Sequence, residues 1–186
     1  MDQIHDEEVR ALAAIATSIR EDYLDDDPAW LTSPFGWIKT RPSRQVGTIG
    51  EKLVAGWLAA KGFNVIRSPD SDADRIVENK RVEIKFSTLW RSGTYKFQQL
   101  RDQNYDLAIC LGVSPFDAHA WILTKDQIRQ QWGTGLPFQH GGSVGRDTVW
   151  LTIRPNQPQS WLIPTTGRLR DAVTELSKIT GYTPTL

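Results

Sequence analysis

Several residue types and patterns that define common protein classes are scarce in this 186-residue chain. The single cysteine, Cys110, excludes a disulfide framework and a zinc centre built from cysteines, and its apolar surroundings indicate a buried thiol. No apolar run approaches the roughly 20 residues needed to span a bilayer, so we expect no membrane span. The acidic N-terminus lacks the basic start and apolar core of a signal peptide. These absences favour a cytoplasmic globular protein with one main domain.

Net charge is absent as well, because 22 basic and 22 acidic side chains balance, but the charges are unevenly placed. Residues 1–27 carry nine acidic side chains and two basic ones, so the remainder is basic. Residues 75–101 carry seven basic side chains and two acidic ones. A basic segment of this kind suits a phosphate backbone. If the position of this segment in the fold is ignored, ordinary solvated surface charge is the simpler explanation of its basic residues.

The most informative stretch is a predicted hairpin over residues 74–87. Apolar and polar residues alternate in its second half, as in a half-buried strand, and this places Glu83 and Lys85 on one face. A polar break around Asn79 separates that strand from a shorter apolar run. The hairpin should therefore turn near Asn79 and return Asp74 to the neighbourhood of Lys85.

Two carboxylates and an ammonium group at one end of a ribbon suit phosphoryl chemistry. The hard oxygens of Asp74 and Glu83 would bind Mg2+, which keeps several waters and favours substrate phosphates. A bound metal lowers the pKa of its water, and Lys85 beside it would stabilise a charged transition state. An isolated Glu-x-Lys triplet, by contrast, usually belongs to the solvated face of an exposed strand.

The helix predicted over residues 47–61 supplies a third carboxylate, Glu51. We expect Glu51 in the first turns of that helix, where a carboxylate interacts favourably with the helix dipole. The alternative is that Glu51 faces the hairpin and completes a metal site with Asp74 and Glu83.

The remaining pattern predicts an α/β fold in layers, with a mixed central sheet flanked by helices. Residues 105–113 form a near-continuous apolar run, which is typical of a central strand covered on both faces. Thr124 and Gln127 have the spacing of a helix-capping box. Helices are predicted over residues 6–24, 47–61, 95–103, 124–128 and 168–180, and strands over residues 63–66, 76–77, 82–87, 105–113, 118–123, 148–153 and 161–163.

Four features, taken in order, resemble the PD-(D/E)xK nuclease superfamily, which has the restriction-endonuclease-like fold. The resemblance extends from about residue 47 to residue 128. The features are Glu51 in a Gly-x-x-Gly-Glu helix, Asp74, the triplet Glu83-Ile84-Lys85, and the predicted helix with Phe97-Gln98-Gln99 that leads to Tyr105-Asp106.

Two other aspartates compete with Asp74 for the family's first acidic position. The literal Pro-Asp pair of the family is Pro69-Asp70, and Asp72 lies between that pair and Asp74. An apolar pair, Ile76-Val77, follows shortly after Asp74 and favours a strand there. Asp74 therefore suits the family's first acidic position better than Asp70 or Asp72. Its spacing to Glu83 is short, but a tight hairpin permits it.

The resemblance implies a metal-dependent DNA endonuclease that hydrolyses phosphodiester bonds, most like a type II restriction or phage-defence enzyme. Mg2+ is the implied cofactor, and Mn2+ is expected to substitute for it. The implied metal ligands are Asp74, Glu83 and Glu51, and the implied catalytic residues add Lys85 and Gln98, with Gln99 as the alternative to Gln98. The implied nucleic-acid contacts are Arg75, Ser87, Arg91, Lys96, Gln99, Arg101, His140 and Arg146.

The implied architecture is a three-layer core in which helices flank the mixed sheet. Residues 1–46 would form an N-terminal helical arm and aromatic loop, and residues 47–186 the nuclease domain, with a core at 47–128 and a C-terminal extension at 129–186. A palindromic double-strand cut would require a homodimer, with the arm as candidate interface. Two alternatives stay open: a repair or recombination nuclease acting on branched or damaged DNA, and a non-cleaving DNA-binding subunit of a defence complex.

Overall fold

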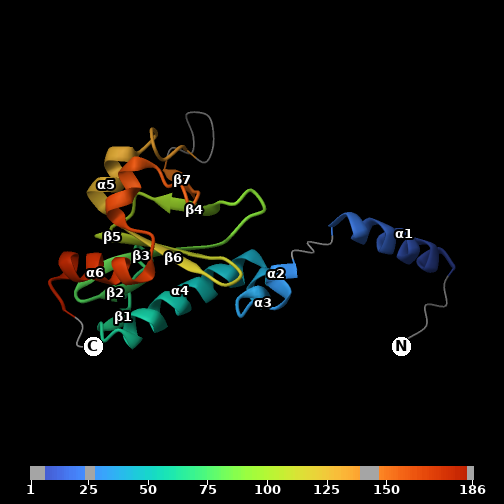
Figure 1. The fold of residues 1–186 in the computed structure, drawn as a ribbon, viewed down its shortest axis with the longest axis horizontal. Helices are drawn as coiled ribbons and strands as arrows, with labels where there is room; N and C mark the ends of the chain where they lie inside the picture. The colour runs from blue at the N-terminus through green and yellow to red at the C-terminus, as the bar shows by residue number, and fades with distance from the viewer. Residues whose placement is uncertain (1–6, 24–27, 139–146, 184–186) are drawn as a thin grey trace. The chain divides into compact units, whose positions relative to one another are not determined.

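The computed structural model describes residues 7–23, 28–138 and 147–183 (Figure 1). The chain divides into two compact units, residues 1–32 and residues 33–186. The first unit contains helices α1 (Glu7–Tyr23) and α2 (Pro28–Leu31), and α1 confirms the helix predicted at the N-terminus. No helix of the described ranges is long and apolar enough to cross a membrane.

The second unit contains the remaining helices and all of the strands. Its helices are α3 (Gly36–Lys39), α4 (Ser43–Ala60), α5 (Lys125–Gln131) and α6 (Leu169–Thr180), with a 3-10 helix, η1 (Ser160–Thr165). Its strands are β1 (Val65–Arg67), β2 (Arg75–Val77), β3 (Lys80–Thr88), β4 (Tyr95–Arg101), β5 (Leu107–Val113), β6 (Ala118–Thr124) and β7 (Thr148–Ile153).

Five strands form a mixed sheet in the order β1-β2-β3-β5-β6, which confirms the predicted fold class. Strands β3 and β5 are parallel, and the other neighbouring pairs are antiparallel. Strands β4 and β7 form a separate two-stranded antiparallel sheet. The five-stranded sheet is the central layer of the unit, and its middle strands carry the candidate site.

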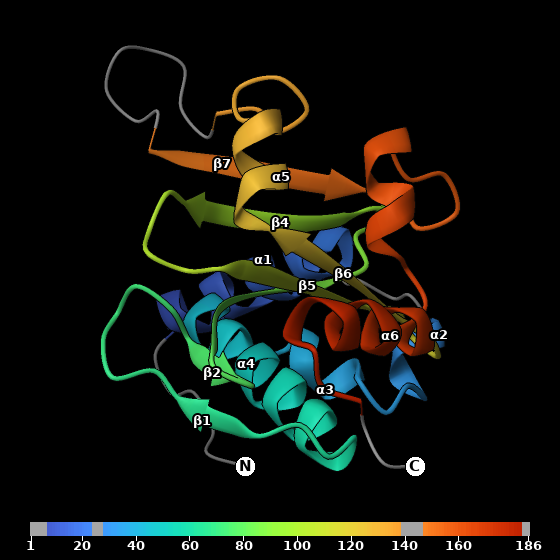
Figure 2. The same ribbon diagram turned by 90° about the vertical axis from the view of Figure 1, so that its left-hand side faces the viewer.

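Different elements cover the two faces of the central sheet (Figure 2). Helices α4 and α6 pack against one face, through a core that includes Leu58 and Leu176. The β4–β7 sheet, α5 and η1 cover the other face, through a core that includes Phe97 and Trp121. Every residue of β5 is buried, as the apolar run predicted, and Cys110 is fully buried among them. Three layers are therefore present, but one outer layer is partly β-structure.

The helix predicted over residues 95–103 is wrong, because this segment is strand β4. Tyr95 and Phe97 are buried in strand alternation, and a bulge then shifts the register between Phe97 and Leu100. Gln99 adopts a positive φ of 57° within the bulge. One inserted residue changes the apolar spacing from two to three, which imitates helical periodicity.

Two other differences concern segment boundaries and type. The strand predicted over residues 161–163 is the 3-10 helix η1, which contains Pro164, a residue that cannot donate to a strand ladder. Helix α4 begins at Ser43, so the predicted boundary between residues 46 and 47 falls inside this helix. The predicted capping box of Thr124 and Gln127 is present at the start of α5.

Candidate active site

The hairpin of β2 and β3 has the predicted form. It turns at Glu78 and Asn79, which both have positive φ angles of 47° and 66°, as a two-residue hairpin turn with the twist of its strands requires. Asp74 directly precedes β2, and its Oδ2 accepts a 2.7 Å hydrogen bond from the backbone N–H of Ile84. The Asp74 N–H donates to the carbonyl of Val82 at 2.9 Å. These bonds place the Asp74 carboxylate beside the middle of β3.

Glu83 and Lys85 project from β3 toward the face that the β4–β7 sheet covers. Their register partners on β5, Ala108 and Cys110, both belong to the core on that side. Lys85 Nζ lies 2.7 Å from Glu83 Oε1. The Glu83 side chain is 8% exposed, and this burial raises its pKa, as does the charge of Asp74, while Lys85 opposes the rise. The site therefore concentrates negative charge in a poorly solvated place.

Glu51 approaches this site because α4 packs unusually close to β3. A Cβ atom added at Gly50 would lie 2.1 Å from Cβ of Phe86, so only glycine permits the contact. Glu51 lies more than two turns from the start of α4, so the predicted position in the first turns is wrong. Burial raises the pKa of Glu51, and the charge of Asp74 raises it further.

The charged groups around the carboxylates compensate them only in part. Arg75 Nη2 lies 3.5 Å from Glu51 Oε2, and Arg75 Nη1 donates to the Asp74 carbonyl at 2.7 Å. The charge of Arg101, at the end of β4, lowers the pKa of Glu83. The pKa values of Glu51 and Glu83 are nevertheless raised, so the site would gain from a further cation.

The donor chemistry fits a hard divalent cation. Asp74 and Glu83 offer carboxylate oxygens, which Mg2+ prefers, and their mutual repulsion would be relieved by a bound ion. Across residues 7–23, 28–138 and 147–183, no three His, Cys, Asp or Glu side chains are grouped so that they could hold a metal ion. Glu51 instead pairs with Arg75, so direct coordination by all three carboxylates would require the Glu51 side chain to move.

Gln98, Gln99 and Ser87 do not have the positions that were predicted for them. Gln98 and Gln99 are exposed on the bulge of β4, and they do not lie on a helix. Ser87 is buried, where its Oγ accepts from the Lys96 N–H at 3.0 Å and donates to the Thr88 carbonyl at 2.8 Å. Ser87 thus joins β3 to β4 and is not a surface contact.

The predicted basic contacts lie on or after the same strands. Lys96 Nζ lies 3.9 Å from the ring centroid of Trp90, which is 46% exposed on the β3–β4 turn. Arg91, on that turn, and Arg101 are both exposed. His140 and Arg146 lie outside the described residues.

Tyr105 is a site neighbour that sequence reasoning missed. Its side chain is buried, and its hydroxyl has no hydrogen-bond partner in the described part of the chain. Burial raises the pKa of Tyr105, and the charge of Glu83 raises it further. A tyrosine at the start of an apolar strand reads as core, so no sequence signal separates this position from ordinary packing.

The sequence matches no protein-family model and no curated protein. Among solved structures, the chain is similar to a bacterial homing endonuclease, I-Ssp6803I. The two share 12% sequence identity, and the match covers 76% of this chain and 96% of that chain, with a TM-score of 0.48.

Proposed function

We propose that this protein is a divalent-metal-dependent DNA endonuclease that hydrolyses phosphodiester bonds. The observation that carries the proposal is the meeting of Asp74 and Glu83 at the β2–β3 hairpin, with Lys85 2.7 Å from Glu83 on the same strand face. Two hard carboxylates and one ammonium group are the set that phosphoryl transfer needs, because its transition state must be positioned and neutralised.

Asp74 and Glu83 would hold the metal ion, together with the carbonyl of Ile84 between them. When bound, Mg2+, or Mn2+ in its place, would lower the pKa of a water and neutralise charge on the phosphate. The N–H of Ile84 fixes the orientation of the Asp74 carboxylate before any ligand binds. Glu51 faces the site from α4, where it would orient waters around the ion.

Lys85 acts by charge in this scheme. The Lys85 ammonium group already pairs with the Glu83 carboxylate at 2.7 Å. Lys85 therefore stabilises negative charge that develops on the phosphoryl oxygens.

The DNA backbone would lie along the exposed side chains of β4. Arg101 and Lys96 present positive charge there, and Gln98 and Gln99 are exposed between them. Contacts of this kind position a duplex without specifying its sequence. By the family resemblance we assign the protein to the restriction or phage-defence type, acting as a homodimer on a palindromic site.

The test is cleavage of unmethylated plasmid and phage DNA in Mg2+ and in EDTA. Discrete fragments that require Mg2+ are expected, and mapping of their ends would give the recognition sequence. A smear, or cutting confined to branched DNA, would replace the restriction assignment with a repair or nonspecific nuclease. Salt-sensitive binding without cleavage in any of these conditions would overturn the nuclease proposal in favour of a DNA-binding subunit.

A further inference from the structure

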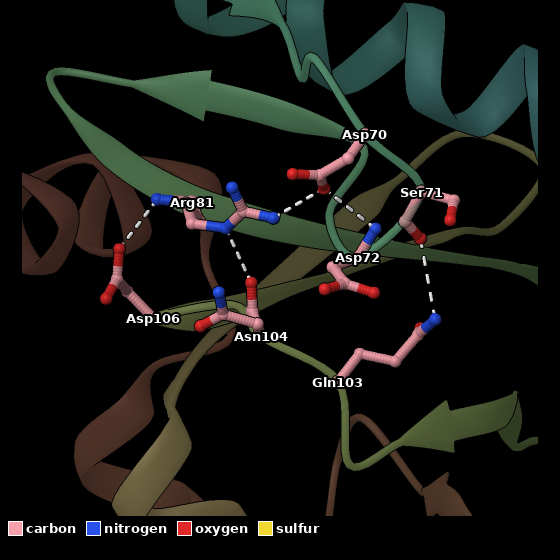
Figure 3. Close-up of polar contacts among 7 residues, drawn as sticks. All are labelled: Asp70, Ser71, Asp72, Arg81, Gln103, Asn104 and Asp106. Atoms are coloured by element: carbon pink, nitrogen blue, oxygen red, sulfur yellow. Dashed lines mark hydrogen bonds and ion pairs between the residues drawn. The ribbon is translucent and has the colours of Figure 1, made fainter.

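Arg81, the second residue of β3, links two loops on either side of the hairpin (Figure 3). Its Nη2 lies 2.5 Å from Oδ1 of Asp70, in the β1–β2 loop. Its Nε donates at 2.6 Å to the carbonyl of Asn104, in the β4–β5 loop. The planar guanidinium can serve both acceptors at once because its donors have a fixed fork geometry.

Further hydrogen bonds extend the contact between these loops. The Arg81 N–H donates to Asp106 Oδ2 at 2.7 Å, and the Asp106 N–H donates to the Arg81 carbonyl at 2.9 Å. Gln103 Nε2 donates to the Ser71 carbonyl at 3.4 Å. We call residues 68–74 and 102–106, joined through Arg81, the loop clamp.

Each of the two loops in the loop clamp contains a residue at the candidate site. Asp74 is the last residue of the first loop, and Asp70 Oδ1 also accepts the N–H of Asp72 within it at 3.0 Å. Tyr105 lies in the second loop, and its buried side chain shares a core with Ala73 from the first. Movement of either loop would therefore shift Asp74 or Tyr105 relative to Glu83.

The Arg81–Asp70 pair contributes little to overall stability, because both side chains are solvent-accessible, at 23% and 50%. Exposed ion pairs typically have small effects on unfolding. The hydrogen bond from Arg81 also lowers the pKa of Asp70. A contact that hardly stabilises the fold, yet ties two loops at a site, acts chiefly on local geometry.

We propose that Arg81 is a positioning residue, which holds the Asp74 loop in the geometry that binds the metal ion. This assignment rests on the function proposed above. Loss of the link should loosen residues 68–74 and weaken metal binding, while the fold and the DNA-binding surface on β4 stay intact.

The test compares four single variants, and the double variant of Arg81→Ala with Asp70→Asn, with wild type in four measurements. Arg81→Ala removes the link, Arg81→Lys keeps the charge without the fork, and Asp70→Asn weakens one end. Lys80→Ala, the adjacent basic residue on β3, is the matched control. The measurements are amide hydrogen exchange, Mn2+ affinity, DNA affinity in EDTA, and the melting temperature.

Arg81→Ala should speed exchange in residues 68–74 and weaken Mn2+ binding about tenfold. That is the lower end of the effect of losing a direct partner of a metal ligand, because Arg81 acts on Asp74 only through the loop. Arg81→Lys should fall between Arg81→Ala and wild type. Melting should shift by less than about 3 °C, and DNA affinity in EDTA should stay within about twofold. In the Arg81→Ala background, Asp70→Asn should add little, because both substitutions act on the same Arg81–Asp70 contact.

Unchanged exchange and Mn2+ affinity in Arg81→Ala would overturn the assignment. So would an equal effect of Lys80→Ala, or a large fall in melting temperature that accounts for every change. Wild-type protein that neither binds Mn2+ nor cuts DNA would refute the proposed function, and with it the role of Arg81 toward a metal. That result is measured on the wild type alone, so failure of the proposed function is distinguishable from failure of the Arg81 assignment.

Discussion

Two glycines of α4 allow a matched test of how Glu51 reaches the site. A Cβ atom at Gly50 would lie 2.1 Å from Cβ and 2.4 Å from Cγ of Phe86. Rotation of the phenyl ring cannot relieve a clash with Cβ, so α4 and β3 would have to separate by about 1 Å. A Cβ atom at Gly56, on the same helix, would meet nothing within 4 Å.

Gly50→Ala should destabilise the protein, although alanine favours helix. Overpacking costs about 1–3 kcal/mol and the helix preference of alanine returns about 1 kcal/mol, so a net loss of up to about 2 kcal/mol is expected. Gly56→Ala gains the preference alone and should be about 1 kcal/mol more stable. Each kcal/mol corresponds to about 2–4 °C in the melting temperature of a chain of this size.

The two variants should also differ in activity. Separation of α4 from β3 would carry Glu51 away from Asp74, and a shift of about 1 Å at a catalytic site can reduce the rate about a hundredfold. Urea unfolding and cleavage rates measured together on both variants decide the matter. If Gly50→Ala is as stable and active as Gly56→Ala, the close approach of α4 to β3 is wrong.

Three further predictions concern charge and DNA contact. Lys85→Ala should reduce the cleavage rate by about a hundredfold or more with little change in DNA affinity, because its charge acts in the transition state; an unchanged rate would remove Lys85 from the mechanism. Burial raises the folded pKa of Glu51 above its usual 4.5, so Glu51→Gln should stabilise the protein at pH 7. The gain should disappear as the pH falls below 4.5. Urea unfolding at pH 7 and below pH 4.5 checks the sign, and equal gains at the two pH values would contradict the prediction. Trp90→Ala should weaken DNA binding about tenfold in fluorescence anisotropy, whereas Trp37→Ala, at a similarly exposed indole, should not; equal losses would place the DNA elsewhere.

Local patterns account for the part of the site that the sequence predicts well. Strand alternation and a polar break are enough to place Glu83 and Lys85 on one face and to turn the hairpin at Asn79. Asp74 reaches Ile84 by the same short-range pairing. Strand β5 is equally readable, because its burial on both faces leaves a continuous apolar run.

Contacts between distant segments explain the failures. Strand β4 pairs with β7, about fifty residues later, and the bulge at Gln99 conceals its alternation. The approach of Glu51 depends on the packing of Gly50 against Phe86, which no pattern within α4 indicates. The loop clamp of Arg81 joins three separate segments, so its members read singly as ordinary surface charges and turn residues.

In the proposed function, the carboxylates of the hairpin hold the divalent ion that DNA cleavage needs. The most direct measurement is the cleavage rate of Glu83→Gln beside Glu78→Gln, a carboxylate at the turn of the same hairpin, on DNA that the wild type cuts in Mg2+. We predict a loss of more than about a hundredfold for Glu83→Gln, beyond what the loss of an outer-shell partner causes, and a wild-type rate for Glu78→Gln. Wild-type cleavage by Glu83→Gln would contradict the account.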